Sequence, residues 1–203
     1  MQAAVLKADG SLVVESVPAP HPEPGEVVLR VRDCGICGSD LHAAAHPWQL
    51  PPDSIMGHEF SGTIAAVGAG VSGIAEGDPV VVQSVIGCGG CDSCDAGLPN
   101  HCGRRVTIGV HADGGFAEYC AVPAANIYAV PPGVSLEAVA LLQPFAIAAY
   151  ALEVGGVGPG DRIGVWGDRP KVRWQNWSVF SNCAVCLWSG SCSRSCAQKP
   201  GHS

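Results

Sequence analysis

The chain has 203 residues, 47% hydrophobic and 14% charged, with a formal net charge of −7. Such a chain can bury a sizeable core, and its acidity argues against a general nucleic-acid-binding protein. The sequence has no run of about 18 apolar residues and no signal-peptide layout at its start, so we expect no membrane partner and a cytoplasmic location. In that compartment the 11 cysteines are expected to be thiols or metal ligands rather than disulfides.

Short apolar stretches separated by Pro/Gly-rich turns dominate residues 1–135. Examples are residues 26–32, 62–67 and 79–83. Strands at this spacing predict a small barrel or sandwich. The sequence of residues 68–73, GAGVSG, matches a phosphate-binding glycine pattern, but no helix can follow it before Pro79, so we interpret it as a turn.

Helical and α/β patterns follow. Ser135 is a candidate N-cap for a helix over 135–142, and we expect Pro144 to separate it from a second helix over 147–152. Residues 160–167, GDRIGVWG, indicate a turn, a short strand and a glycine, as at the start of a nucleotide-binding unit. The helix that should come next is missing from the sequence after Asp168.

Four cysteines lie in one loop, in the pattern Cys88-x2-Cys91-x2-Cys94-x7-Cys102. Four thiols at this spacing are typical of a tetrahedral zinc site that leaves no coordination position open, and such sites are structural. The alternatives are unpaired thiols or a disulfide.

A second candidate zinc site comes from the motifs CGICGSDLH and GHEFSG. Cys37, His58 and Glu59 could supply three protein ligands, as an open catalytic zinc site requires. Cys34 competes with Cys37, and spacing does not choose between them. Because adjacent residues of an extended chain point in opposite directions, only one of His58 and Glu59 is expected to bind the metal directly.

These motifs, the four-cysteine loop, DGGFAEYCAVPAANIYAVPPGVSLEAVALLQP and GDRIGVWG occur in the order seen in zinc-dependent medium-chain alcohol and polyol dehydrogenases. The chain resembles this family over about residues 1–168. The resemblance implies a mainly β, GroES-like, partly open barrel with a structural zinc lobe, followed by the start of a Rossmann unit. It also implies two zinc ions per chain, NAD or NADP, a small alcohol or polyol substrate and a homo-oligomer in the intact family member.

The resemblance further implies roles for individual residues. Asp40 would orient the zinc histidine, while Ser39 and His42 would relay the substrate proton to solvent. The catalytic zinc ligands would be Cys37, His58 and Glu59, and the structural zinc ligands would be Cys88, Cys91, Cys94 and Cys102.

Three further positions carry less specific assignments. Gln143 stands where polyol and threonine dehydrogenases often have Glu, so it would reach the zinc only through a water. His46 and Trp48 stand where the family lines its substrate pocket, although an exposed loop histidine and a partly buried tryptophan are equally simple interpretations. Gly167 would be a remnant of the cofactor-binding turn.

The composition changes abruptly after Asp168. All 18 acidic residues lie at or before it, whereas residues 169–203 hold none. Shifting the reading frame by one base from Arg169 permits G-D-G-P-K-G followed by an apolar helical face, so we interpret this tail as out of frame. A natural divergent tail is the alternative.

The predicted organisation is therefore a catalytic domain over 1–153, a first Rossmann strand over 154–168 and a disordered tail over 169–203. The predicted function is oxidation of a CH–OH group with zinc and NAD(P), impaired in a chain of this extent. The alternative is a stand-alone zinc-binding module without catalysis. A zinc-free quinone reductase and a co-chaperonin are disfavoured by the two zinc motifs.

Overall fold

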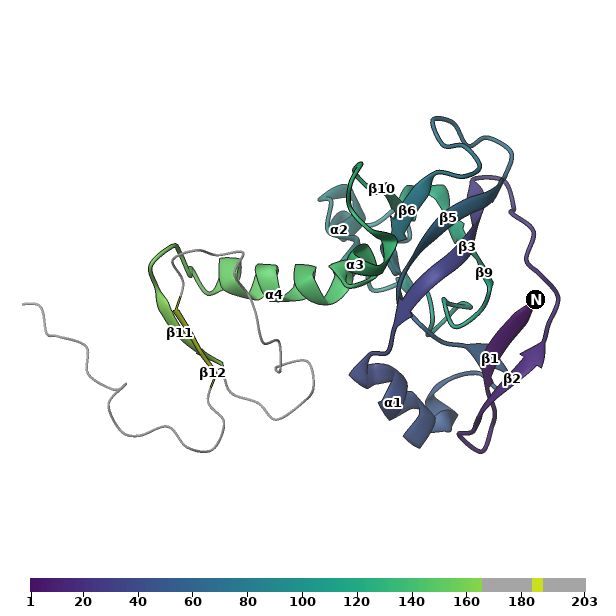
Figure 1. The fold of residues 1–203 in the computed structure, drawn as a ribbon, viewed down its shortest axis with the longest axis horizontal. Coiled ribbons are helices and arrows are strands. Elements are labelled where there is room, and N and C mark those ends of the chain that lie inside the picture. The colour runs from purple at the N-terminus through teal and green to yellow at the C-terminus, as the bar shows by residue number, and fades with distance from the viewer. Residues whose placement is uncertain (166–183, 188–203) are drawn as a thin grey trace, which may run out of the picture. The chain divides into compact units, whose positions relative to one another are not determined.

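The computed structural model describes residues 1–165 and 184–187. They fall into two compact units, Met1–Ala146 and Ile147–Ser203. The first unit is mainly β, as the sequence predicts (Figure 1). None of the helices in the described part of the chain has the length and apolarity that a membrane span requires. The predicted boundary at residue 153 stays a prediction, because compactness alone does not show where a cofactor domain begins.

A five-stranded antiparallel sheet forms the centre of the first unit, in the order β10-β6-β5-β3-β9. Its strands are β3 (Glu26–Gly35), β5 (Glu59–Val67), β6 (Pro79–Val82), β9 (Tyr119–Pro123) and β10 (Ile127–Ala129). Buried side chains such as Val27, Leu29, Phe60 and Val122 form its core. Within the described residues β9 and β10 remain edge strands, so the sheet is open and no closed barrel forms.

The pairing of β3 with β5 positions the first candidate site. Its register shifts twice and ends with Cys34 opposite Phe60 and Gly35 opposite Glu59. The strands approach closely at Gly62, where a Cβ atom would lie 2.2 Å from the carbonyl oxygen of Arg30. This register therefore brings the segment around Cys37 beside His58 and Glu59, about twenty residues apart in sequence.

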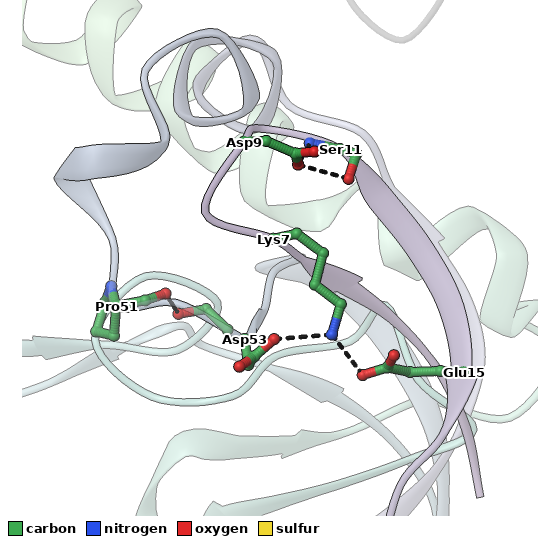
Figure 2. A network of polar contacts seen from close by, with 7 residues as sticks. Lys7, Asp9, Ser11, Glu15, Pro51 and Asp53 are labelled. Carbon is green, nitrogen blue, oxygen red and sulfur yellow. Dashed lines mark hydrogen bonds and ion pairs between the residues drawn. The ribbon is translucent and has the colours of Figure 1, made fainter.

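A smaller sheet joins β1 (Gln2–Leu6) to β2 (Leu12–Ser16) and β4 (Ser54–Ile55). Figure 2 shows Lys7 between two carboxylates, with Nζ 2.8 Å from Glu15 Oε1 and 2.7 Å from Asp53 Oδ1. These contacts link the β1–β2 hairpin to the segment before β4. Because such surface ion pairs are screened by solvent, they contribute little to stability.

Short helices carry the connections. They are α1 (Gly38–Ala45), α2 (Asp92–Asp95), α3 (Leu136–Ala140) and α4 (Leu142–Val154), with 3-10 turns at Pro47–Gln49, Pro99–His101 and Ala124–Asn126. The short pair β7 (Val85–Ile86) and β8 (Val106–Thr107) flanks the four-cysteine loop. Residues 68–73 lie in the connection after β5 and form no helix, as predicted.

Two helices form here, as predicted, but they are separated at Leu141 and not at Pro144. Ser135 caps α3 through a hydrogen bond from the Ala138 N–H to Ser135 Oγ (3.2 Å), as expected. However, α4 begins at Leu142 and runs through Pro144. Proline is tolerated there because the first-turn N–H groups have no partner within the helix in any case.

In the second unit, β11 (Arg162–Val165) confirms the strand predicted within residues 160–167. It pairs in parallel with β12 (Ala184–Leu187), from Arg162 opposite Ala184 to Val165 opposite Leu187. Strand β12 belongs to the expected out-of-frame tail over 169–203; Gly167 and the remaining residues of that tail lie outside the described residues.

Candidate metal centres

Cys37, His58 and Glu59 come together in the structure. Their candidate ligand atoms lie within 4.8 Å of one another, and His58 and Glu59 are buried. Cys37 is the N-cap residue of α1, and Glu59 is the first residue of β5. His58 precedes that strand and follows Gly57, whose φ is +94°. His58 therefore does not follow the alternation of the strand, and the candidate ligand atoms of both adjacent residues lie in the cluster. That only one of them binds the metal directly stays a prediction.

Gly35 makes room for the Glu59 side chain. A Cβ atom on Gly35 would lie 2.8 Å from Glu59 Oε2 and 3.3 Å from Glu59 Cβ. The missing side chain thus leaves a space that the carboxylate fills. Thiolate, imidazole and carboxylate together are a donor set that suits zinc, and these three residues could hold it.

Asp40 connects the cysteine to the histidine. It is buried, and its Oδ2 accepts a hydrogen bond from the Cys37 N–H at 2.7 Å. Its Oδ1 lies 3.4 Å from Nδ1 of His58, an ion-pair contact too long and poorly aligned for a good hydrogen bond. The carboxylate therefore faces one ring nitrogen of His58 and leaves the other available to a metal.

The electrostatics of His58 follow from this arrangement. Burial lowers the pKa of His58, but the Asp40 carboxylate and the Cys37 thiol outweigh burial and raise it to about 9. Without a metal the ring thus carries a proton that offsets nearby negative charge. A bound cation would take over that role.

Cys34 lies outside this cluster. Its Sγ contacts the carbonyl oxygen of Gly35 at 3.6 Å, and its side chain packs against the core of the sheet. Burial raises the pKa of the Cys34 thiol to about 12, which keeps it protonated. Of the two thiols that spacing left open, the structure therefore brings Cys37 and not Cys34 beside His58 and Glu59.

Ser39 and His42 lie on α1 beside the cluster. Ser39 Oγ is 3.4 Å from Nε2 of His58, whereas His42 is exposed. Both line a small pocket of about 180 Å³ together with Asp40. Its other walls are mostly apolar: Ala43, Leu50, Met56, Gly109 and Val110.

The rings of His42, His46 and Trp48 form a row. The centroids of His42 and His46 are 4.4 Å apart, and those of His46 and Trp48 are 4.9 Å apart, both edge to face. Trp48 is 75% exposed, so the interpretation of it as a partly buried residue is wrong.

Gln143 occupies the first turn of α4. Its Oε1 accepts a hydrogen bond of 3.3 Å from Oγ of Ser84, which is itself buried. This contact gives the amide a structural partner that the sequence did not indicate.

The four loop cysteines form the second cluster. The Sγ atoms of Cys88, Cys91, Cys94 and Cys102 lie within 4.8 Å of one another. Cys91 is the N-cap residue of α2, whereas Cys102 follows the 3-10 turn at Pro99–His101. Gly87 keeps the loop compact, because a Cβ there would lie 2.9 Å from Cys94 Sγ.

Backbone N–H groups favour the thiolate form of Cys102 in this cluster. The N–H of Cys88 is the main influence that lowers the pKa of Cys102, to about 6, and burial opposes it while the N–H of Arg104 adds to it. The Arg104 side chain also donates to Cys88 Sγ, a contact that sequence reasoning missed. At Cys94, in contrast, the Gly89 N–H lowers the pKa, but burial and hydrogen bonds with the other three cysteines outweigh it and raise the pKa to about 11. By their proximity the four sulfur atoms fit a tetrahedral zinc ion.

A model of the alcohol dehydrogenase GroES-like domain matches residues 23–132, more than half of the chain. This stretch contains all seven cysteine, histidine and glutamate residues of the two clusters. The chain belongs to the alcohol dehydrogenase family with a GroES-like domain. The predicted family is thereby confirmed.

Two relatives of this GroES-like chain are named as dehydrogenases. It is 35% identical to L-galactonate-5-dehydrogenase of Escherichia coli K12 over 172 residues, 84% of this chain and 50% of the relative. It is 39% identical to L-threonine 3-dehydrogenase of Stenotrophomonas maltophilia over 150 residues, 71% of this chain and 44% of the relative. The chain thus spans about half the length of the curated relatives it matches.

A solved structure supports the same family assignment. An alcohol dehydrogenase from E. coli CFT073, determined with NADH, superposes with a TM-score of 0.76 at 39% identity. The match covers 82% of this chain and 49% of that structure. The fold described above is therefore the fold of this family's GroES-like part.

Proposed function

We propose that this chain provides the catalytic zinc domain of an oxidoreductase that acts on the CH–OH group of a small alcohol or polyol with NAD or NADP. The cluster of Cys37, His58 and Glu59 beside a pocket carries the proposal. A buried site with three protein ligands suits catalysis, whereas the four-cysteine cluster suits structural zinc. The relatives that act on L-galactonate and L-threonine, by their names, support a hydroxylated substrate.

The roles of the residues follow from their positions. A bound zinc ion would supply Lewis-acid polarisation of the alcohol oxygen, and a bound nicotinamide would supply a hydride acceptor. Cys37, His58 and Glu59 would hold the metal, and Asp40 would orient the His58 ring.

The proton of the substrate hydroxyl needs a path to solvent. Ser39 lies at the buried His58, and His42 lines the same pocket and is exposed. Ser39 would accept the substrate proton as it passes its own hydroxyl proton toward His42, across the pocket that both residues line. The exposed imidazole of His42, which offers one donor and one acceptor nitrogen, would release a proton to water. The apolar walls of the pocket would accommodate the carbon chain of the substrate.

We further propose that residues 1–203 by themselves oxidise alcohols slowly or not at all, since they span about half the length of the relatives. Production of NADH or NADPH by the purified chain with a panel of alcohols and polyols tests this. Turnover comparable with that of full-length dehydrogenases would contradict it.

A second experiment separates the catalytic domain from a stand-alone zinc module and needs no cofactor. Cobalt(II), which takes similar ligands, is substituted for zinc, and its visible spectrum is followed during titration with an aliphatic alcohol. We expect a spectral change in the wild-type chain and none in His58→Ala. If the wild-type spectrum does not respond, the metal site is closed and the stand-alone module is favoured.

A further inference from the structure

Arg104 contacts both ends of the four-cysteine cluster. Its backbone N–H donates to Sγ of Cys102 at 3.3 Å, and its Nη2 donates to Sγ of Cys88 at 3.1 Å. The same Nη2 also donates to the carbonyl oxygen of Gly90 at 3.0 Å. The side chain of Arg104, two residues after the last cysteine, therefore binds the first cysteine of the loop and the backbone after it.

The Cys88 end is the open end of the cluster. Cys102 is completely buried, whereas Cys88 is exposed. Gly89 and Gly90 follow Cys88 and offer no side chain to cover it, and a Cβ on either would meet no atom within 4 Å. Water, protons and chelators would therefore reach the metal on the Cys88 side.

The cluster would carry negative charge, so a cationic side chain at the Cys88 end would stabilise it. A zinc ion with four thiolates keeps about two negative charges, and Asp92 and Asp95 on α2 add more. In the described part of the chain, the cationic side chain that donates to a cluster sulfur is Arg104. Its neighbour Arg105 donates instead to the carbonyl oxygen of Cys102, at 3.3 Å.

We propose that Arg104 is a positioning residue that holds Cys88 against the metal, and that it slows both zinc release and the reaction of Cys88 with alkylating agents. The inference rests on the proposal that the four cysteines bind zinc. Its physical basis is a charge-assisted hydrogen bond to sulfur, which is stronger than a neutral one. Because a zinc-bound Cys88 is already a thiolate, the Arg104 charge would not raise its thiolate fraction but would lower its nucleophilicity.

Arg104→Gln and Arg105→Gln form a matched pair for the test, because they remove adjacent positive charges and only the first contacts sulfur. Both are made in a His58→Ala background, so that the four-cysteine site holds the remaining zinc. Zinc release is timed in excess EDTA, and alkylation of Cys88 by iodoacetamide is followed by mass spectrometry.

We expect Arg104→Gln to release zinc about fivefold faster and to alkylate faster at Cys88, while Arg105→Gln behaves as the parent; the modest factor reflects an exposed ion pair. The difference should shrink at about 1 M salt, where charges are screened within a few ångströms. Arg104→Lys, which keeps the charge, should fall between the two.

Equal release from Arg104→Gln and Arg105→Gln would overturn the proposal. If Arg104→Gln does not fold, zinc release is compared between Arg104→Lys and the parent, and the salt dependence of the parent is measured. A rate of zinc release from the parent that does not depend on salt would contradict the inference. Failure of the parent to hold zinc would instead contradict the zinc assignment itself.

Discussion

Gly35 lies opposite Glu59 in the β3–β5 pair, so close that a Cβ on Gly35 would come within 2.8 Å of Glu59 Oε2. The strand thus leaves a space for the carboxylate of a candidate zinc ligand. We predict that Gly35→Ala weakens zinc binding at this site about tenfold and preserves the fold, since a flexible carboxylate can move aside. Competition with a fluorescent zinc chelator measures the affinity.

Gly38→Ala is the matched control for that variant. It lies next to Cys37, at the start of α1, and a Cβ there would meet nothing within 4 Å. Its zinc affinity should equal that of the wild type. If the two variants bind zinc equally well, the space beside Glu59 does not matter for the metal.

The pKa of His58 predicts how the metal-free chain depends on pH. Because its pKa is raised to about 9 from 6.5, protonation stabilises the fold fully below pH 6.5, and this contribution is lost as pH rises through about 9. The loss is on the order of 3 kcal/mol, since each pKa unit corresponds to about 1.4 kcal/mol. Urea unfolding of the chelator-treated chain from pH 6 to 9.5 measures it.

Asp40→Asn separates this effect from the ionisation of cysteines over the same range. The amide can still accept from the Cys37 N–H but no longer favours the imidazolium. The variant should therefore lose less stability than the wild type between pH 6.5 and 9. If the free energy of unfolding changes with pH in the same way in both chains, Asp40 is not the cause of the raised His58 pKa.

The hydrogen bond between Ser84 and Gln143 predicts a structural role for this glutamine. In a double-mutant cycle of Ser84→Ala and Gln143→Ala, we expect a coupling energy of about 1 kcal/mol in unfolding experiments. Zinc content should be unchanged in Gln143→Ala. Loss of zinc from this variant would instead make Gln143 part of the metal site.

The proposal that residues 169–203 are out of frame makes a genetic prediction. The nucleotide sequence around codon 169 should continue, one base away, into an open frame with alternating strand and helix patterns. Stop codons in both alternative frames would contradict it.

The cysteine motif indicated that four thiols would lie together, and they do, because these residues are local in sequence. The other cluster depends on long-range register. Spacing could not choose between Cys34 and Cys37, since the choice depends on how β3 ends against β5, with Cys34 opposite Phe60. The turn at Gly57, which lets His58 and Glu59 both reach the site, has only a glycine as its signal in the sequence.

Other features were hidden for different reasons. The acceptance of Pro144 in α4 depends on where the helix begins, and helix boundaries are poorly determined by sequence patterns. Arg104 is exposed and looks like an ordinary surface residue, so its position two residues after Cys102 was the one available clue.

The zinc content of the purified chain tests the central claim most directly. Mass spectrometry under native conditions should find two zinc ions per wild-type chain, one for each cluster of the structure. Cys94→Ser and His58→Ala should each retain one, and only Cys94→Ser should lose considerable stability, because the four-cysteine site is structural. A wild-type chain with fewer than two zinc ions would contradict the account. Retention of both ions by both variants would contradict it as well.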